Sequence, residues 1–194
     1  MTDDGQPVFS GAVLVGGASR RMGRDKAMVR IEGRPLASHI AAVLRAAGAT
    51  EVFVVGGDRE RLAGLGIAWR PDQWPGEGPL GGVITALEQA ANDTVLIAAT
   101  DLIGLAPEDV VPLINACRPD HPVVLPLGGA RPAVLQGAYH RSATALLRAA
   151  FDAGERSVVR AVQGLPVMYC STVRAVPDVD TPEELDLYIQ SRAR

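Results

Sequence analysis

The chain has 194 residues, and its 19 Lys and Arg residues against 22 Asp and Glu residues give a formal net charge of −3. This slight acidity, with only 4% aromatic residues, argues against a nucleic-acid-binding surface. The apolar runs are far shorter than the roughly 20 residues that a membrane-spanning helix requires, and the first residues, Met-Thr-Asp-Asp-Gly, are too acidic for a signal region. We therefore expect one cytoplasmic domain over residues 1–194, with no nucleic acid or membrane as partner.

Short apolar runs alternate along the chain with segments of helical periodicity, which is typical of β-α-β units. Apolar runs bounded by Gly, Pro or Asp predict buried strands at residues 11–15, 51–55, 94–99 and 122–126. Helical stripes, Pro at a first helical position and a capping box predict helices at residues 36–47 and 83–91, from 107, and from 181. The less regular stretch 126–139 could hold an antiparallel insertion. The predicted fold class is α/β: a single-domain, doubly wound, Rossmann-like sheet that is mostly parallel, with helices on both faces.

The cysteines and histidines show no spacing that carries chemistry. Cys117 and Cys170 are far apart and lack the spacing of a zinc site, so we expect both to be unreactive core thiols. His39, His121 and His140 form neither a metal cluster nor a nucleophile pair, and we expect them to be structural or solvated.

The loop after the first predicted strand has the composition of a polyphosphate site. Residues 16–26 hold three glycines, three arginines and one lysine. Glycines let backbone N–H groups converge on an anion, and the cations neutralise its charge. The spacing matches neither a Walker loop nor a dinucleotide-binding loop. A plain solvated turn is the alternative reading.

Lysine occurs once in this sequence, against eighteen arginines, and that lysine is Lys26 in the glycine-rich loop. An ammonium is a compact point charge, whereas a guanidinium is a planar fork. We therefore expect Lys26, together with Arg21, to contact phosphate, and Arg20 and Arg24 to be surface residues.

Two aspartates are candidate ligand-binding residues: Asp101, which follows a predicted strand, and Asp72, which lies in a loop. Asp101 comes just after the strand at 94–99, at the edge where doubly wound sheets bind ligands, and a single carboxylate can hold Mg²⁺ when phosphates supply further ligands. Asp72 lies in a Gly- and Pro-rich stretch that leads through Gly78 into a helix; it could accept hydrogen bonds from a ribose or a guanine, or stabilise a turn. Arg156 could bind a second substrate's phosphate, or be a plain surface arginine.

Several motifs together resemble the molybdenum cofactor guanylyltransferases, and the resemblance runs along most of the chain. The specific ones are Leu14-Val-Gly-Gly17, Arg21-Met-Gly23, Asp25-Lys26 and Gly78-Pro-Leu-Gly81. Asp72, Asp101, Ala153-Gly-Glu-Arg156 and Asp180-Thr-Pro-Glu-Glu184 follow in the same order. The resemblance implies a transferase that joins GMP from GTP to the terminal phosphate of molybdopterin or molybdenum cofactor and releases pyrophosphate, with Mg²⁺ as cofactor and other cofactor-biosynthesis proteins as possible partners.

The resemblance, taken together with the composition of the loops and their positions after predicted strands, leads us to expect roles for particular residues. Arg21, Lys26 and Asp101 would be catalytic, with Asp101 the metal ligand. The nucleotide would be bound by Leu14, Val15, Gly16, Gly17, Lys26, Asp72, Gly78, Pro79, Leu80 and Asp101. The acceptor would be bound by Arg156, Asp178 and Asp180.

The sequence departs from the family pattern at three places. Asp101-Leu-Ile-Gly104 replaces the frequent Asp-x-Pro but keeps the carboxylate, whereas Gly56-Gly57-Asp58 stands where an asparagine is common. Near the C-terminus, Asp178 and Asp180 stand where relatives can have amides. A CTP-dependent cytidylyltransferase or another nucleotidyltransferase with a phosphorylated acceptor is therefore an alternative function. A non-catalytic nucleotide-binding cofactor chaperone is another, although it predicts loss of Lys26 or Asp101.

Overall fold

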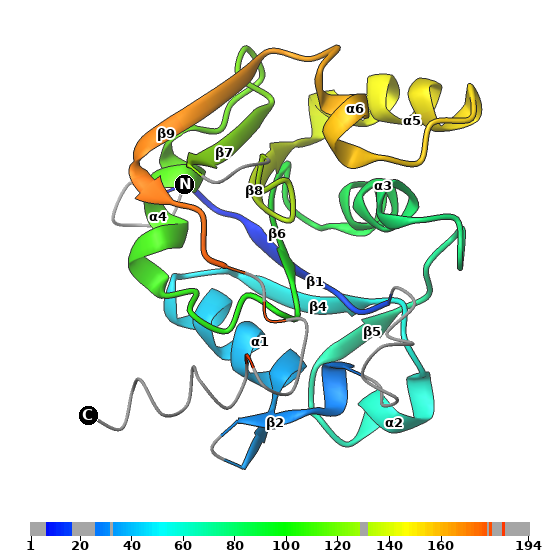
Figure 1. Ribbon diagram of the computed structural model, residues 1–194, viewed down its shortest axis with the longest axis vertical. Helices are drawn as coiled ribbons and strands as arrows, with labels where there is room; N and C mark the ends of the chain where they lie inside the picture. The colour runs from blue at the N-terminus through cyan, green and yellow to red at the C-terminus, as the bar shows by residue number, and fades with distance from the viewer. Residues whose placement is uncertain are drawn as a thin grey trace.

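The computed structural model describes residues 7–16, 26–31, 33–128, 132–177, 179 and 184, with Lys26 described through its backbone. Within these residues, seven strands form one sheet in the order β5-β4-β1-β6-β8-β7-β9 (Figure 1). Of these strands, only β8 runs antiparallel to its neighbours. The strands are β1 (Ser10–Leu14), β4 (Glu51–Val55), β5 (Ala68–Arg70), β6 (Thr94–Ala99), β7 (Val123–Leu127), β8 (Gln136–His140) and β9 (Val167–Arg174).

Helices cover both faces of this sheet, which confirms the predicted doubly wound α/β fold. One face carries α1 and α4, and the other carries α3, α5 and α6 (Figure 1). A small hairpin of β2 (Arg30–Ile31) and β3 (Arg34–Pro35) precedes α1. The helices are α1 (Leu36–Ala46), α2 (Arg59–Ala63), α3 (Pro79–Gln89), α4 (Pro107–Ala116), α5 (Thr144–Asp152) and α6 (Val158–Val162), with 3₁₀ turns η2 (Lys26–Met28) and η3 (Arg141–Ala143).

Successive side chains of the central strands point into two separate cores. In β1, Ala12 packs in the core under α3, whereas Val13 packs in the core under α1. In β4, Phe53 and Val54 divide in the same way. Because a strand alternates its side chains between the two faces, a sheet covered on both sides needs apolar residues at consecutive positions. This requirement explains the uninterrupted apolar runs in the sequence.

The predicted strands agree with the structure to within one residue. The strands at 51–55 and 94–99 have the predicted bounds, while β1 and β7 each differ by one position. The antiparallel insertion is confirmed as β8, which pairs with β6 and β7. The helix predicted from residue 181 falls outside the described residues, apart from Glu184. Among the helices that the structure describes, none combines the length and apolar character needed to span a bilayer.

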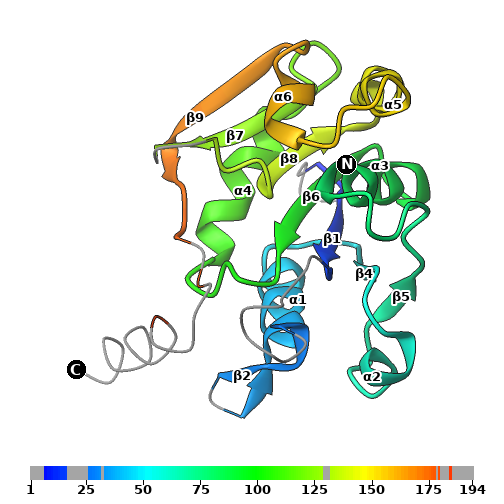
Figure 2. The ribbon, with the colours of Figure 1, turned by 45° about the vertical axis from the view of Figure 1, so that its right-hand side comes forward.

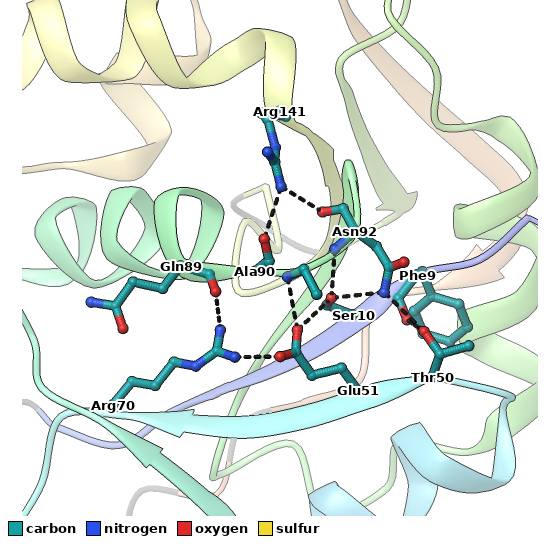
Figure 3. Close-up of polar contacts among 10 residues, drawn as sticks. Phe9, Ser10, Thr50, Glu51, Arg70, Gln89, Ala90, Asn92 and Arg141 are labelled. Atoms are coloured by element: carbon teal, nitrogen blue, oxygen red, sulfur yellow. Dashed lines mark hydrogen bonds and ion pairs between the residues drawn. The ribbon is translucent and has the colours of Figure 1, made fainter.

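A network of polar side chains ties the amino ends of the central strands together (Figure 3). The hydroxyl of the buried Ser10 donates to Glu51 at 2.8 Å and accepts from the side-chain amide of Asn92 at 3.0 Å. Arg70 lies over the ring of Phe53 and pairs with Glu51. These groups form hydrogen bonds and an ion pair with one another at the amino edge of the sheet, opposite to the carboxyl ends of the strands. Their role is structural.

The Glu51 carboxylate gives this network a defined pH dependence. Burial alone would raise the pKa of Glu51, but hydrogen bonds from the Ala91 N–H and the Ser10 hydroxyl, together with the Arg70 guanidinium, lower it. A carboxylate with a lowered pKa stabilises the fold above its unfolded-state pKa of about 4.3, and this contribution is lost as the pH falls. We expect Glu51→Gln to reduce the free energy of unfolding in urea by about 2 kcal/mol at pH 7. The difference in the free energy of unfolding between wild type and Glu51→Gln should shrink at pH 3. An undiminished difference at that pH would show that the Glu51 charge does not stabilise the fold.

The two cysteines differ in burial. Cys117 is buried as predicted, and burial raises its pKa to about 12. The prediction for Cys170 was wrong, because this residue is only half-buried on the edge strand β9, with its sulfur 3.2 Å from the Thr172 hydroxyl. Since the thiolate is the reactive species, a chromogenic disulfide reagent at pH 8 should modify one thiol per folded chain and both after unfolding. Rapid modification of folded Cys170→Ser would show that Cys117 is accessible.

Candidate active site

The candidate site is the carboxyl edge of the sheet, where four neighbouring parallel strands end. Leu14 of β1 is in register with Val55 of β4 and Ala99 of β6, and Val55 is in register with Arg70 of β5. The arrowheads of β1 and β6 point toward the β2–β3 hairpin in Figure 2. The loops that follow these strands therefore meet at one edge, which is where ligands bind in doubly wound sheets.

Val15 and Asp72 lie on either side of Gly56. Val15 continues β1 by donating its N–H to Val55 at 2.9 Å, and Gly56 donates to Arg70 at 3.0 Å. Gly56 has a φ of +78°, and a Cβ added there would lie 2.6 Å from the Val15 carbonyl oxygen and 3.6 Å from Cβ of Asp72. The absence of a side chain at Gly56 therefore lets the Val15 backbone pack closely against it, beside Asp72.

Asp72 stabilises its own loop. Its Oδ1 accepts from the Trp74 N–H at 3.0 Å and from the Thr85 hydroxyl at 3.3 Å. The first of these bonds closes an Asx turn, one of the two roles that the sequence left open for Asp72. Trp74 then packs against Phe151 with ring centroids 5.0 Å apart. Because both hydrogen bonds end on Oδ1, neither of them engages the second carboxylate oxygen of Asp72.

The predicted Gly78–Leu80 segment forms the start of α3. Gly78 precedes the helix at a φ of +91°, and Pro79 occupies its first turn. Leu80 is buried in the core, so only the backbone of this residue can face a nucleotide. The first N–H groups of a helix lack partners within the helix. Leu14 lies against Gly82 of the same helix, with Cδ1 3.6 Å from the position of an added Cβ, so the end of β1 and the start of α3 are adjacent.

Asp101 lies in a tight turn just after β6, following the buried Thr100. Its carbonyl accepts from the N–H groups of Ile103 at 2.9 Å and Val179 at 3.3 Å. His39 of α1 supports the same turn, with Nε2 3.1 Å from the Ile103 carbonyl oxygen, which can only accept. His39 is therefore structural here, as expected, and the half-buried Asp101 is held at the carboxyl edge by elements far apart in the sequence.

Several predicted site residues lie outside the described residues: Gly17, Arg21, Asp178 and Asp180. The side chain of Lys26 also falls outside, although its backbone begins η2. Ala27, the next residue, is buried in the same apolar cluster as Leu102, which follows Asp101. Val179, between Asp178 and Asp180, is buried in a small cluster with Ile31 and Ile103.

The Arg156 side chain contacts Glu77 and Phe151. Its Nε lies 2.7 Å from a carboxylate oxygen of Glu77, its Nη1 donates to the Phe151 carbonyl at 2.9 Å, and its guanidinium covers the Phe151 ring. Hydrogen bonds from Arg160 and from the backbone of the turn hold the pKa of Glu155 at about 2, so this carboxylate fixes the turn that carries Arg156. These contacts hold the Arg156 guanidinium between Glu77, which precedes α3, and Phe151 of α5.

A divalent metal would rest on Asp101 and on the phosphates of a nucleotide. Within the described ranges, no group of three or more His, Cys, Asp or Glu side chains is arranged to hold a metal ion. A site made of Asp101 and nucleotide phosphates would suit Mg²⁺, which is commonly held by one or two carboxylates plus substrate phosphates and water.

Thr85 was missed from the sequence altogether, whereas Gly56 and His39 were named there but the contacts that they make at this edge were not foreseen. Thr85 is the one hydroxyl-bearing residue of α3, lies among apolar neighbours, and is fully buried. A polar residue at a core position requires a hydrogen-bond partner, which is a signal that the sequence does contain.

A mostly parallel, doubly wound sheet with glycine-bearing loops and a strand-end aspartate at its carboxyl edge defines an α/β protein of the nucleotide-binding class. The sequence profile of the MobA-like NTP transferase domain matches residues 11–167. A probable molybdenum cofactor guanylyltransferase of Chloroflexus aggregans is 33% identical over 93% of each chain. The molybdenum cofactor guanylyltransferase of Rhodobacter capsulatus is 34% identical over 91% of this chain and 93% of its own.

The solved structure of molybdopterin-guanine dinucleotide biosynthesis protein A from Archaeoglobus fulgidus has the same fold. It superposes with a TM-score of 0.73 at 22% identity and covers 95% of this chain and 98% of its own. The chain belongs to the MobA-like NTP transferase family, and it is a nucleotidyltransferase.

Proposed function

We propose that this protein transfers GMP from GTP to the terminal phosphate of molybdopterin or molybdenum cofactor and releases pyrophosphate, in the cytoplasm and as a single domain over residues 1–194. The observation that carries the proposal is the placement of Val15, Asp72 and Asp101 just after neighbouring parallel strands, at one edge of the sheet. The names of the relatives in Chloroflexus and Rhodobacter support the choice of guanine and of a molybdenum cofactor acceptor.

The reaction is an in-line displacement at the α-phosphorus of the nucleotide. An oxygen of the acceptor phosphate forms a bond to this phosphorus, and the bond to the bridging oxygen of pyrophosphate breaks. The attacking phosphate is already ionised at neutral pH, so the enzyme needs no nucleophile of its own. Its main tasks are to align two anions and to offset the charge that builds on the departing group.

Each part of the carboxyl edge would perform one of these tasks. The backbone of Leu14, Val15 and Gly16 would meet the guanine, with Gly17, Asp72 and the start of α3 around the nucleoside. Lys26 and Arg21 would offset phosphate charge, and Asp101 would hold Mg²⁺, whose positive charge polarises the phosphate oxygens. The acceptor would approach from the side of Val179, because this residue donates its N–H to the Asp101 carbonyl and is flanked by Asp178 and Asp180.

Two measurements on the purified protein test the proposal. With Mg²⁺ present, GTP should raise the melting temperature more than CTP, UTP or ATP, because only the correct base is bound by groups placed for it. Pyrophosphate should then be released only when GTP, Mg²⁺ and molybdopterin are all supplied. Preferential stabilisation by CTP would replace guanine by cytosine in the proposal, and binding of GTP without pyrophosphate release would instead favour the non-catalytic cofactor chaperone.

A further inference from the structure

One face of α3 lies along the loop that carries Asp72. The residues of this face are four or fewer positions apart, at helical spacing, and each contacts the loop: Gly81, Thr85, Glu88 and Gln89. Gly81 leaves room for Cβ of Trp74, which lies 3.1 Å from the position of an added Cβ. Glu88 accepts from the Gln73 side chain at 2.8 Å. The loop is therefore held by the helix along its length.

Thr85 is the member of this face that contacts Asp72 directly. Its hydroxyl accepts from the Gln73 N–H at 3.2 Å and lies 3.3 Å from Oδ1 of Asp72. A hydroxyl has a single proton. Because a carboxylate at neutral pH can only accept, this proton is directed at Asp72 while the oxygen receives the N–H of Gln73. The pair of bonds fixes both the backbone next to Asp72 and the orientation of its carboxylate.

The Thr85 hydroxyl is not needed to hold α3 in place. The helix is anchored by fully buried apolar side chains on either side of Thr85, among them Ile84 and Leu87. A valine has nearly the shape of threonine and would fill the same space. The contribution specific to the hydroxyl is therefore exerted on the Asp72 loop.

We propose that Thr85 is a positioning residue for nucleotide binding: by occupying Oδ1, it holds Asp72 in the orientation that presents Oδ2 to the nucleoside. This inference rests on the proposed function, in which Asp72 contacts the nucleotide. A carboxylate that is oriented before the ligand arrives loses less conformational freedom on binding. The effect of Thr85 is thus on affinity rather than on the chemical step.

The test compares Thr85→Val, which removes the hydroxyl, with Thr85→Ser, which keeps it. Thr85→Val should raise the Kd for GTP in isothermal titration calorimetry, and the KM, by up to about tenfold, which is the cost of immobilising one side chain on binding. The kcat should change by less than about twofold, since Thr85 does not touch the reacting atoms. Thr85→Ser should retain the wild-type Kd. If Thr85→Val does not fold, Thr85→Ala is measured in the same way.

A double-mutant cycle distinguishes positioning of Asp72 from a general loss of packing. In the Asp72→Ala background, Thr85→Val should change the Kd for GTP by less than about threefold, because the carboxylate that it positions is gone and only the bond to the Gln73 N–H is lost. An equal tenfold loss in both backgrounds, or a wild-type Kd for Thr85→Val, would overturn the role of Thr85 while leaving the proposed function intact. Failure of the wild-type protein to bind any nucleoside triphosphate would overturn both.

Discussion

Replacing Asp101 with asparagine should slow nucleotidyl transfer at least about 100-fold, the loss typical when one group that stabilises transition-state charge is removed. Asparagine keeps the shape of the side chain but loses the negative charge that a hard divalent cation requires. The backbone turn should survive, because it depends on the Asp101 carbonyl, which accepts from Ile103 and Val179. The measurement is the initial rate of pyrophosphate release at saturating GTP, Mg²⁺ and acceptor.

A matched control for this variant is Asp120→Asn, which removes a carboxylate that is 72% exposed. The control should retain the wild-type rate, and both variants should show wild-type circular dichroism and urea midpoints. Raising the Mg²⁺ concentration should not restore the Asp101→Asn rate fully, since a neutral amide binds the cation poorly. A wild-type rate in Asp101→Asn would remove this residue from the mechanism.

Replacing Gly56 with alanine should lower the free energy of unfolding by about 3 kcal/mol, through left-handed backbone strain together with steric overlap. The φ of +78° disfavours any residue with a Cβ, and that atom would lie 2.6 Å from the Val15 carbonyl oxygen. A backbone oxygen cannot turn aside as a flexible side chain can. Relief of the overlap must move the Val15 backbone away from residue 56 at the end of β4. Because Val15 belongs to the proposed nucleotide site, GTP affinity should fall as well.

The control for Gly56→Ala is Gly64→Ala at the end of α2. Gly64 has a φ of −72°, and no atom lies within 4 Å of an added Cβ. Its substitution should change stability by less than about 0.5 kcal/mol or raise it slightly, because alanine restricts the unfolded chain. Urea unfolding curves of both variants give the comparison. Equal stabilities would show that the contact between Gly56 and Val15 is dispensable.

The sequence predicts the central part of this fold well because burial on both faces leaves a strong pattern. β4 and β6 are apolar at nearly every position, and their predicted bounds match the structure. β9 escaped prediction because it is an edge strand, in which exposed Tyr169 and Thr172 interrupt the apolar residues. β5 has only three residues, which is too few for a period to emerge.

The candidate site could be located from the sequence, but its internal contacts could not. The ends of β1 and β6 pointed to Val15 and Asp101, because parallel strands end at one edge. The bond between Thr85 and Asp72 joins a helix to a loop across thirteen positions, and His39 reaches Ile103 across sixty-four. Such pairs depend on how elements pack, which no local spacing encodes.

The hydrogen bond from Val179 to the Asp101 carbonyl has a consequence for biosynthesis of the enzyme. Translation proceeds from the N-terminus, so the turn after β6 emerges from the ribosome long before the segment that braces it. A nascent chain can assemble most of its sheet while the Asp101 carbonyl still lacks its hydrogen bond from Val179. A chain truncated just before Val179 should therefore fold around its two cores yet lack a fully ordered turn at Asp101.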